Sequence, residues 1–335
     1  MAKKLGTQTV VLDTQPVIIG SAAIVGKKEG EGPLARYFDD IIEDEYAGEK
    51  TFEAAESRFM LNAYNKALEK SGKSASDIDF ILSGDLLNQC TAASYAFRDV
   101  SIPYFGLFGA CSTMSESLVL ASMLIDSGAA SNVVCAVSSH FCSAERQFRF
   151  PLEYGSQRTP TSQWTVTGAG AVILSKEGQG PRITCVTPGK IVDEGIKDSN
   201  NMGAAMAPAA ADTIMAHLKD TGRTVDEYDM ILTGDLGSFG SQMLVELLKR
   251  NGIDTKDKHH DCGTMIFDLN RQDVVCGGSG CACSATVLSS YIMERFRNNQ
   301  LKRILFVATG ALLSPTRIKQ GETIPSIAHG VCIEA

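Results

Sequence analysis

The sequence predicts an α/β fold that consists of two pseudo-symmetric halves, each rich in βαβ units. Two observations predict this fold: a sequence repeat at a constant offset of 150 residues, and short apolar segments that alternate with helix-like segments. The length of 335 residues corresponds to roughly two domain-sized units. With 44% hydrophobic and 21% charged residues, the composition is that of an ordinary globular protein and excludes disorder as the main state.

The charge balance and the apolar segments exclude further classes of protein. Lys and Arg number 31 against 39 Asp and Glu, a net charge of −8, and no dense basic run occurs, so we expect no nucleic-acid partner. No stretch reaches the roughly eighteen apolar residues of a spanning helix, and the N-terminal segment makes a poor signal peptide. Ten cysteines are too few for a disulfide scaffold, which favours free thiols and a cytoplasmic location.

The repeat relates residues 67–86 (ALEKSGKSASDIDFILSGDL) to residues 217–236 (HLKDTGRTVDEYDMILTGDL), with eight identities in twenty positions. In each copy a helix-like segment ends at a glycine, Gly72 or Gly222, which suits the left-handed position after a helix. A polar turn follows, and then a short apolar run that is typical of a buried parallel strand. We therefore expect the same helix–turn–strand unit in both halves.

The similarity between the halves continues after each repeat. A helix-like stretch and the strand-like residues 133–137 follow in the first half, and a second helix-like stretch and residues 304–308 follow in the second. Strands that alternate with helices predict parallel pairing and right-handed crossovers. The Gly-rich polar stretch 175–182 marks the seam, so we divide the chain into residues 1–176 and 177–335.

Small residues at 168–171 (GAGA) precede the apolar run 172–174. This pattern predicts close packing of a helix on a strand. It does not match a dinucleotide site, because no G-x-G-x-x-G opens a helix after a strand here. We expect no cofactor.

Cys111 is the first candidate for chemistry. Small residues lead into it, and a helix-compatible segment follows to about Asp126. At a helix N-terminus the dipole, equivalent to roughly half a positive charge, stabilises a thiolate over a thiol. This placement predicts a nucleophilic or anion-binding cysteine. A buried structural cysteine is the alternative, because free cysteines are among the most buried residues.

The duplicated halves, the helix start at Gly109–Ser112 and the run 166–172 (VTGAGAV) resemble the thiolase superfamily over essentially the whole chain. This resemblance implies a layered α-β-α-β-α core, with Cys111 where thiolases and ketoacyl synthases carry the acyl group. The segments 144–151 (AERQFRFP) and Ser138–His140 are similar to the stage V sporulation protein AD family. That resemblance implies binding of dipicolinic acid (pyridine-2,6-dicarboxylate), with membrane partners that load it into the developing spore.

Two departures from condensing enzymes argue against catalysis. Such enzymes need two polar groups, His with His or Asn, which activate the cysteine and form an oxyanion hole. The strand end at 233–237 (TGDLG) and the later loop at 277–281 (GGSGC) contain neither His nor Asn. The sequence therefore favours a pocket that binds without condensing.

Two alternatives to this non-catalytic binding function remain open. The first is an enzyme, either an acyltransferase dependent on acyl-CoA or acyl carrier protein, or a ketoacyl synthase-like protein. It would use Cys111 as nucleophile, with His329 or His140 as base. The second alternative is a structural partner whose ancestral pocket is vestigial.

A flat dianion needs cationic or backbone donors beside an apolar slot. Arg146 and Arg149 offer bidentate pairing to a carboxylate, although a surface or dimer salt bridge explains them equally well. His140 follows a strand end, where α/β sites gather, and His329 lies near a second reactive group of thiolases; structural histidines are the alternative. The candidate ligand-binding residues are Cys111, Ser139, His140, Arg146, Arg149, Ser279 and His329.

The remaining candidates favour structural roles. Asp235 repeats Asp85, so we expect both to cap their strand ends. The residues 259–262 (HHDC) and the cysteines within 276–283 are metal-ligand types, but their spacing matches neither paired C-x-x-C nor H-E-x-x-H. We therefore expect no metal site.

The resemblance also implies how the protein associates. Calcium would reach the protein only as the counter-ion of dipicolinic acid, that is, as its calcium salt. Thiolase relatives are commonly dimers, which implies a homodimer. Other stage V sporulation membrane proteins would hold the chain peripherally at the spore inner membrane, on its cytoplasmic side.

Overall fold

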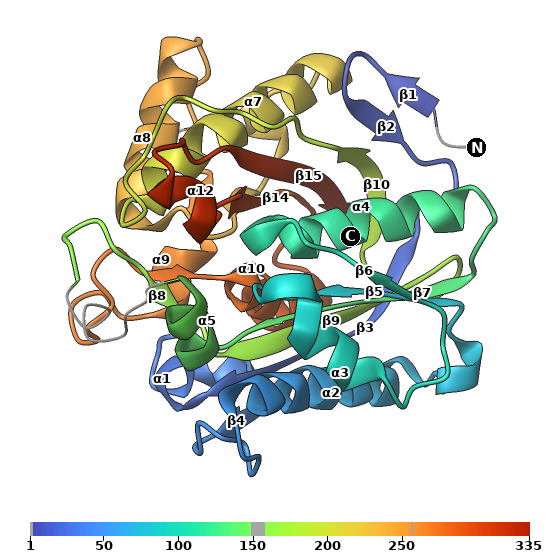
Figure 1. The fold of residues 1–335 in the computed structure, drawn as a ribbon. Helices are drawn as coiled ribbons and strands as arrows, with labels where there is room; N and C mark the ends of the chain where they lie inside the picture. The colour runs from blue at the N-terminus through green and yellow to red at the C-terminus, as the bar shows by residue number, and fades with distance from the viewer. Residues whose placement is uncertain (1–2, 149–157, 256) are drawn as a thin grey trace.

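The computed structural model describes residues 3–148, 158–255 and 257–335, and shows helices on both faces of a large mixed sheet (Figure 1). Each half of the repeat contributes five neighbouring strands, and the two sets meet where Val17 pairs with Arg182. In the first half the spatial order is β6 (Tyr104–Gly106), β5 (Phe80–Gly84), β7 (Asn132–Ser139), β9 (Gly168–Ser175) and β3 (Val17–Gly26). In the second half it is β12 (His259–Asp261), β11 (Met230–Thr233), β14 (Arg303–Ala311), β15 (Ser326–Glu334) and β10 (Arg182–Thr187).

The two strand sets have the same pairing pattern. The three outer strands of each set run parallel, and the two strands nearest the junction pair antiparallel. Successive residues of the central strands face opposite layers. On β7, for example, Val133 belongs to the hydrophobic cluster between the two strand sets. Val134 belongs to the cluster under the outer helices of the first half. The sheet faces are therefore both buried, as the apolar strand segments predict.

The helices complete an α-β-α-β-α arrangement, which confirms the predicted layers. Figure 1 shows α2 (blue) along one outer face and α7 (yellow) along the other, with α4 and α10 between the two strand sets. Three separate hydrophobic clusters fill the spaces between these layers. The principal helices are α2 (Phe52–Ser71), α3 (Thr91–Phe97), α4 (Thr113–Asp126), α5 (Phe141–Phe148), α7 (Met202–Thr221), α8 (Gly237–Arg250) and α10 (Cys281–Val287).

Shorter elements connect these layers. Helix α10 continues through a π-helical turn, Leu288–Ile292, into α11 (Met293–Arg297). The hairpin of β1 and β2 belongs to the first half in sequence, but its strand β2 pairs with β10 of the second half. The other short elements are β1 (Lys3–Leu5), β2 (Thr9–Val11), α1 (Lys27–Gly30), β4 (Asp40–Ile42), β8 (Trp164–Thr165), α9 (Cys262–Ile266), β13 (Gly278–Ser279) and α12 (Pro315–Lys319).

The internal repeat is a structural repeat. Helices α2 and α7 are each 20 residues long, and both end at a left-handed glycine, Gly72 or Gly222, with φ of 68°. After each helix, Asp79 or Asp229 accepts hydrogen bonds of 2.6 and 2.9 Å from backbone N–H groups at the start of β7 or β14. The predicted helix–turn–strand unit is therefore confirmed in both halves.

The glycine-rich run on β9 allows α10 to lie directly on the strand. A Cβ atom at Gly170 would come within 2.5 Å of the carbonyl carbon and oxygen of Ala285. No larger side chain fits without moving the helix backbone. This contact confirms the predicted close helix–strand packing.

Among the described ranges, no helix is both long enough and apolar enough to cross a bilayer.

Several carboxyl groups are buried in this fold, among them that of Glu56 on α2. Its two oxygens accept hydrogen bonds from the hydroxyls of Ser138 (3.0 Å) and Ser143 (2.7 Å). Burial, and then the charge of Asp85, raise the pKa of Glu56 to about 8. Glu56 is therefore largely protonated in the folded chain at neutral pH.

The raised pKa of Glu56 predicts that stability falls as pH rises. Between the unfolded pKa near 4.5 and the folded pKa of about 8, the folded chain binds the extra proton. The free energy of unfolding should therefore fall, by at most about 1.4 kcal/mol per pH unit for one group. Urea unfolding at pH 5.5, 6.5 and 7.5 measures this slope.

The matched variants are Glu56→Gln and the exposed Glu69→Gln. Glu56→Gln should flatten the slope in part, because burial also raises the pKa of Glu29 and of Asp261 to about 7. Glu69→Gln should leave it unchanged. A slope that is identical in all three proteins would contradict the assignment.

Candidate functional site

A cavity of about 290 Å³ opens beside Cys111, where the first half of the fold meets the second. Its walls are mainly apolar, with hydroxyl and amide groups between them. The residues that line it are Leu86, Phe108, Ala110, Cys111, Ala144, Glu145, Phe148, Thr165, Ser199, Asn200, Met202, Ser279, Ala311, Leu312, Leu313 and Ser314.

Cys111 sits in a tight turn immediately before α4. Ala110 has φ of 51°, a left-handed conformation that is strained for a residue with a side chain. Strand β14 of the second half supports this turn, because a Cβ atom at Gly310 would lie 2.5 Å from the Gly109 carbonyl oxygen. The predicted position of Cys111 at the start of a long helix is confirmed.

The surroundings of the thiol, however, oppose the thiolate that a helix N-terminus favours. Burial raises the pKa of the Cys111 thiol well above its ordinary value, and the neighbouring Asp235 carboxylate raises it further. A hydrogen bond from the backbone of Gly280 opposes this rise. Desolvation and the adjacent negative charge together outweigh the partial charge of the helix terminus, so Cys111 is a thiol at neutral pH.

Asp235 is the functional residue that the sequence analysis missed. It is fully buried at the end of β11, and its carboxylate interacts with the Cys111 thiol. The same carboxylate accepts hydrogen bonds from the hydroxyls of Thr309 (2.8 Å) and Ser279 (3.0 Å), and from the Gly280 N–H (3.1 Å). Burial raises the pKa of Asp235, and these hydrogen bonds oppose the rise.

The expected capping role holds for Asp85 and not for Asp235. Asp85 accepts the backbone N–H groups of Leu87 and Ala93, each at 2.7 Å. In the second half Asp261 takes this role, because it accepts the N–H groups that follow Asp235 along the chain. Asp235 is thereby free to face the other half. The signal was its position, the strand end at which ketoacyl synthases offer a histidine.

Ser279 and Cys111 are the predicted residues that the structure brings together. Both line the cavity and both contact Asp235. Ser139, in contrast, is buried outside the cavity lining. Its hydroxyl donates to the Val166 carbonyl (2.7 Å) and accepts from the Ala282 N–H (3.1 Å), so it holds the start of α10.

Neither predicted histidine lines the cavity. His140 is buried, with Nε2 2.9 Å from the Glu45 carbonyl and with the Phe52 ring beside it. Its Nδ1 accepts the Cys142 N–H, and burial lowers its pKa. His329 lies on β15, where its Nδ1 accepts the Gly189 N–H at 3.1 Å. Burial lowers the pKa of His329 to about 4, so the ring is neutral.

The predicted arginines are not part of the described site. Arg146, at the end of α5, forms an ion pair with Glu53, and its side chain is half exposed. It faces a shallow hollow apart from Cys111. Arg149 lies outside the described residues. Among the lining residues that the structure describes, Glu145 is the charged one, and the polar donors are Thr165, Ser199, Asn200, Ser279 and Ser314.

The comparison with known sequences gives one consistent result. The family model described as Stage V sporulation protein AD (SpoVAD) matches residues 6–334. The chain is 49% identical to stage V sporulation protein AD of Bacillus subtilis (strain 168) over 333 residues. That alignment covers 99% of this chain and 98% of the relative.

Solved structures show that the fold is thiolase-like. The 3-oxoacyl-[acyl-carrier-protein] synthase III of Aquifex aeolicus has a TM-score of 0.58 at 15% identity, covering 96% of this chain and 100% of that one. A variant of Xanthomonas campestris OleA has a TM-score of 0.62 at 16% identity, covering 99% and 100%. At this identity the similarity concerns the fold alone.

The charge of Asp235 beside the Cys111 thiol leads to a prediction about the reactivity of this cysteine. Asp235→Asn removes a negative charge beside the thiol, so the pKa of Cys111 should fall, although burial keeps it raised. At pH 8 the thiolate fraction should rise about tenfold for each unit of that fall. The rate of alkylation by iodoacetamide should then rise about three- to fourfold for each unit, because a less basic thiolate is a weaker nucleophile. Mass spectrometry of the Cys111 peptide measures the rate from pH 7 to pH 10.

Asp85→Asn is the matched control, because it neutralises the equivalent buried carboxyl of the first half. Its alkylation profile at Cys111 should follow the wild type. If Asp235→Asn and the wild type have equal alkylation profiles, Asp235 does not influence the pKa of Cys111.

Proposed function

The chain belongs to the stage V sporulation protein AD family, and from this premise we propose that it binds dipicolinic acid at the Cys111 cavity without catalysing a reaction. In this proposal it is a component of the apparatus that loads dipicolinic acid into the developing spore. Its partners are other stage V sporulation membrane proteins, which hold it peripherally at the inner membrane of the spore, on the cytoplasmic side.

The contact between Asp235 and Cys111 carries the non-catalytic part of the proposal. Acyl transfer to a cysteine needs a thiolate, a base that generates it and donors aimed at the developing oxyanion. Here burial, and then the neighbouring Asp235 carboxylate, raise the pKa of the thiol, and this carboxylate accepts hydrogen bonds from the hydroxyls of Ser279 and Thr309. The groups around Cys111 therefore oppose thiolate formation, and the nearest donors bond to Asp235.

The size and lining of the cavity support a small, flat ligand. Ligand pockets span about 300–1,000 Å³, so a cavity of about 290 Å³ suits one substituted ring rather than a long acyl chain. Phe108 and Phe148 offer apolar faces for the pyridine ring. Hydroxyl and amide groups, including those of Thr165 and Asn200, offer hydrogen bonds to its carboxylates.

The charge of the ligand needs a compensating cation, because the described lining of the cavity contains no Lys or Arg side chain. Two sources are consistent with the proposal. Arg149 stays a predicted partner for a carboxylate and follows directly after the lining residue Phe148 in sequence. Alternatively, the ligand enters as its calcium salt, which brings two positive charges of its own.

Calorimetric titration with dipicolinic acid, with and without calcium, tests this function. The wild type should show saturable heat. Thr165→Trp, which fills the cavity from β8, should lose it. Thr14→Trp is the matched control, because the backbone of Thr14 binds Asp126 at the opposite end of α4, and it should bind normally.

Two results would overturn the proposed binding function. The first is the absence of heat in the wild type under both conditions. The second is a covalent acyl adduct on Cys111 after incubation with acetyl-CoA, detected by intact-mass measurement. That adduct would establish the acyltransferase alternative instead.

Within the described ranges, β6 pairs with β5 alone, and its other edge supports a homodimer through the first half. Strand β6 ends the sheet order, and an unpaired strand edge is a template for another strand. Phe105 and Phe108 beside this edge are 48% and 53% exposed, and Leu120 on α4 is 38% exposed. Pairing of two such edges would cover these side chains.

Light scattering after size-exclusion chromatography tests the dimer. The wild type should elute with the mass of two chains, and Phe105→Glu should shift it to one. Ile191→Glu, at an exposed apolar residue of the second half, should remain dimeric. A wild-type mass of one chain at all concentrations would refute the dimer.

A fluorescent fusion of the protein in sporulating cells tests the membrane partners. The fusion should leave the spore membrane when the genes of these partners are deleted.

A further inference from the structure

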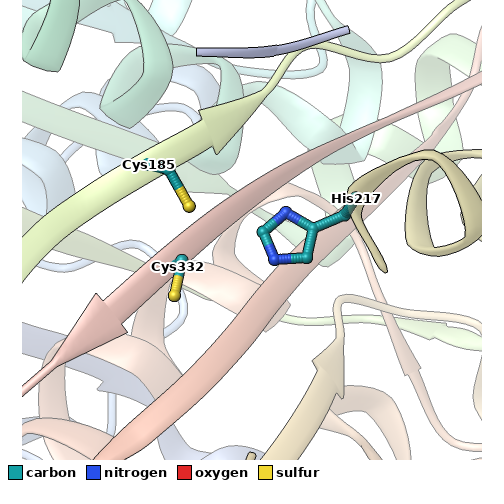
Figure 2. A group of neighbouring side chains, drawn as sticks. All are labelled: Cys185, His217 and Cys332. Atoms are coloured by element: carbon teal, nitrogen blue, oxygen red, sulfur yellow. The ribbon is translucent and has the colours of Figure 1, made fainter. Parts of the chain in front are cut away.

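Three potential metal ligands lie together in the outer part of the second half, away from the lining of the Cys111 cavity. They are Cys185 on β10, His217 on α7 and Cys332 on β15, and all three are buried. Their sulfur and nitrogen atoms lie within 4.8 Å of one another. Figure 2 shows both thiols on neighbouring strands, with the imidazole of His217 approaching them from the helix at the right of the view.

The backbone fixes this convergence. Cys185 and Cys332 are register partners on antiparallel strands, so their side chains leave the sheet on the same face. Both belong to the hydrophobic cluster between this sheet and α7. His217 lies near the C-terminal end of α7. This helix packs on β15 and β14. The three ligands therefore join elements that are far apart in sequence.

We propose that Cys185, His217 and Cys332 form a binding site for a borderline-soft divalent cation of the zinc type. Thiolate and imidazole are the ligands that such ions prefer, with three or four of them in tetrahedral geometry. Zinc holds them at about 2.0–2.3 Å, which places ligand atoms roughly 3.5–3.8 Å apart. Side-chain movements of about 1 Å close the present cluster to that size.

The binding step balances in charge and protons. The cation displaces one proton from each thiol, and both protons pass to solvent. Two thiolates, one neutral imidazole and one divalent cation then form a centre with no net charge. No oxidant or reductant takes part.

The surrounding polar groups suit this centre. Arg223 Nη1 lies 3.2 Å from the Cys332 sulfur, as an N–H donor to a thiolate does, and its guanidinium also pairs with Glu334 (3.1 Å). The two nitrogens of His217 contact the hydroxyls of Thr187 (2.8 Å) and Tyr228 (2.7 Å). When one nitrogen binds the cation, the other donates its N–H to a hydroxyl and orients the ring. The hydroxyl released by the first nitrogen, and the Glu334 carboxylate with Oε1 3.6 Å from the Cys332 sulfur, are the candidate sources of a fourth ligand.

Such a centre would be structural. It is enclosed in the core and would tie β10, β15 and α7 together, as closed zinc sites do in small domains. The inference is independent of the proposed function, because none of its three ligands lines the Cys111 cavity.

Titration of the reduced, chelator-treated full-length protein with cobalt(II) tests the site, because tetrahedral cobalt reports thiolate ligands by its absorption. We expect thiolate-to-cobalt bands in the near ultraviolet, visible bands of tetrahedral cobalt, and loss of both on addition of zinc(II). Cys185→Ser, Cys332→Ser and His217→Gln should each weaken cobalt binding by about tenfold or more. Cys135→Ser, at a buried cysteine on β7 of the first half, is the control and should bind normally.

A second readout guards against variants that fail to fold. Zinc(II) should raise the melting temperature of the wild type and of Cys135→Ser, since a cation that binds the folded chain stabilises it. Tyr228→Phe keeps the ring in the core and removes one hydroxyl partner of His217, so it should weaken binding by about tenfold.

Two outcomes would overturn the site. One is the absence of thiolate-to-cobalt bands in the wild type, or bands that survive equally in all the variants. The other combines two results for the wild type. Mild oxidation lowers its mass by two hydrogens, and the protein binds no cobalt after it has been reduced again. That result would identify Cys185 and Cys332 as a cross-strand disulfide pair only.

Discussion

The contact between backbone and backbone at a few glycines is the constraint on which the rest of this structure depends. Gly170 lets α10 lie on β9, and Gly310 lets β14 lie against the turn that carries Cys111. Both contacts are too close for any side chain. As a result, both strand sets pack against the same two central helices, α4 and α10. As a consequence, a cysteine of the first half and an aspartate of the second half interact directly beside the cavity.

Electrostatics then decides what that space can do. A carboxylate removed from water is unfavourable unless donors surround it, and Asp235 has hydroxyl, thiol and N–H donors. The same donors would have to turn to a reacting carbonyl in an acyl transfer. Cys111 is held as a thiol by burial and by this neighbour. One residue type at one strand end therefore opposes formation of a thiolate at Cys111.

Much of the fold could be predicted from the sequence, because its signals are local. Glycine caps, polar turns and apolar strand segments recur at a fixed offset, and each element follows from a few adjacent residues. The position of Cys111 before a long helix is likewise local. The surroundings of His140 are not: its ring is enclosed by Phe52 and bound by the carbonyl of Glu45, which lie far away in sequence. The chemistry of a histidine suggests a site, but its contacts depend on tertiary packing.

Asp235 shows why a repeat alone is an incomplete guide. The repeat makes it equivalent to Asp85, and Asp85 does cap its strand end. In the second half Asp261 accepts the corresponding backbone N–H groups instead. The 150-residue repeat does not predict this exchange, because it aligns Asp85 with Asp235. Likewise His217 corresponds to Ala67 in the first half, so its cluster with two cysteines has no counterpart there. Duplication supplies the framework, and the specific chemistry arises where the two copies differ.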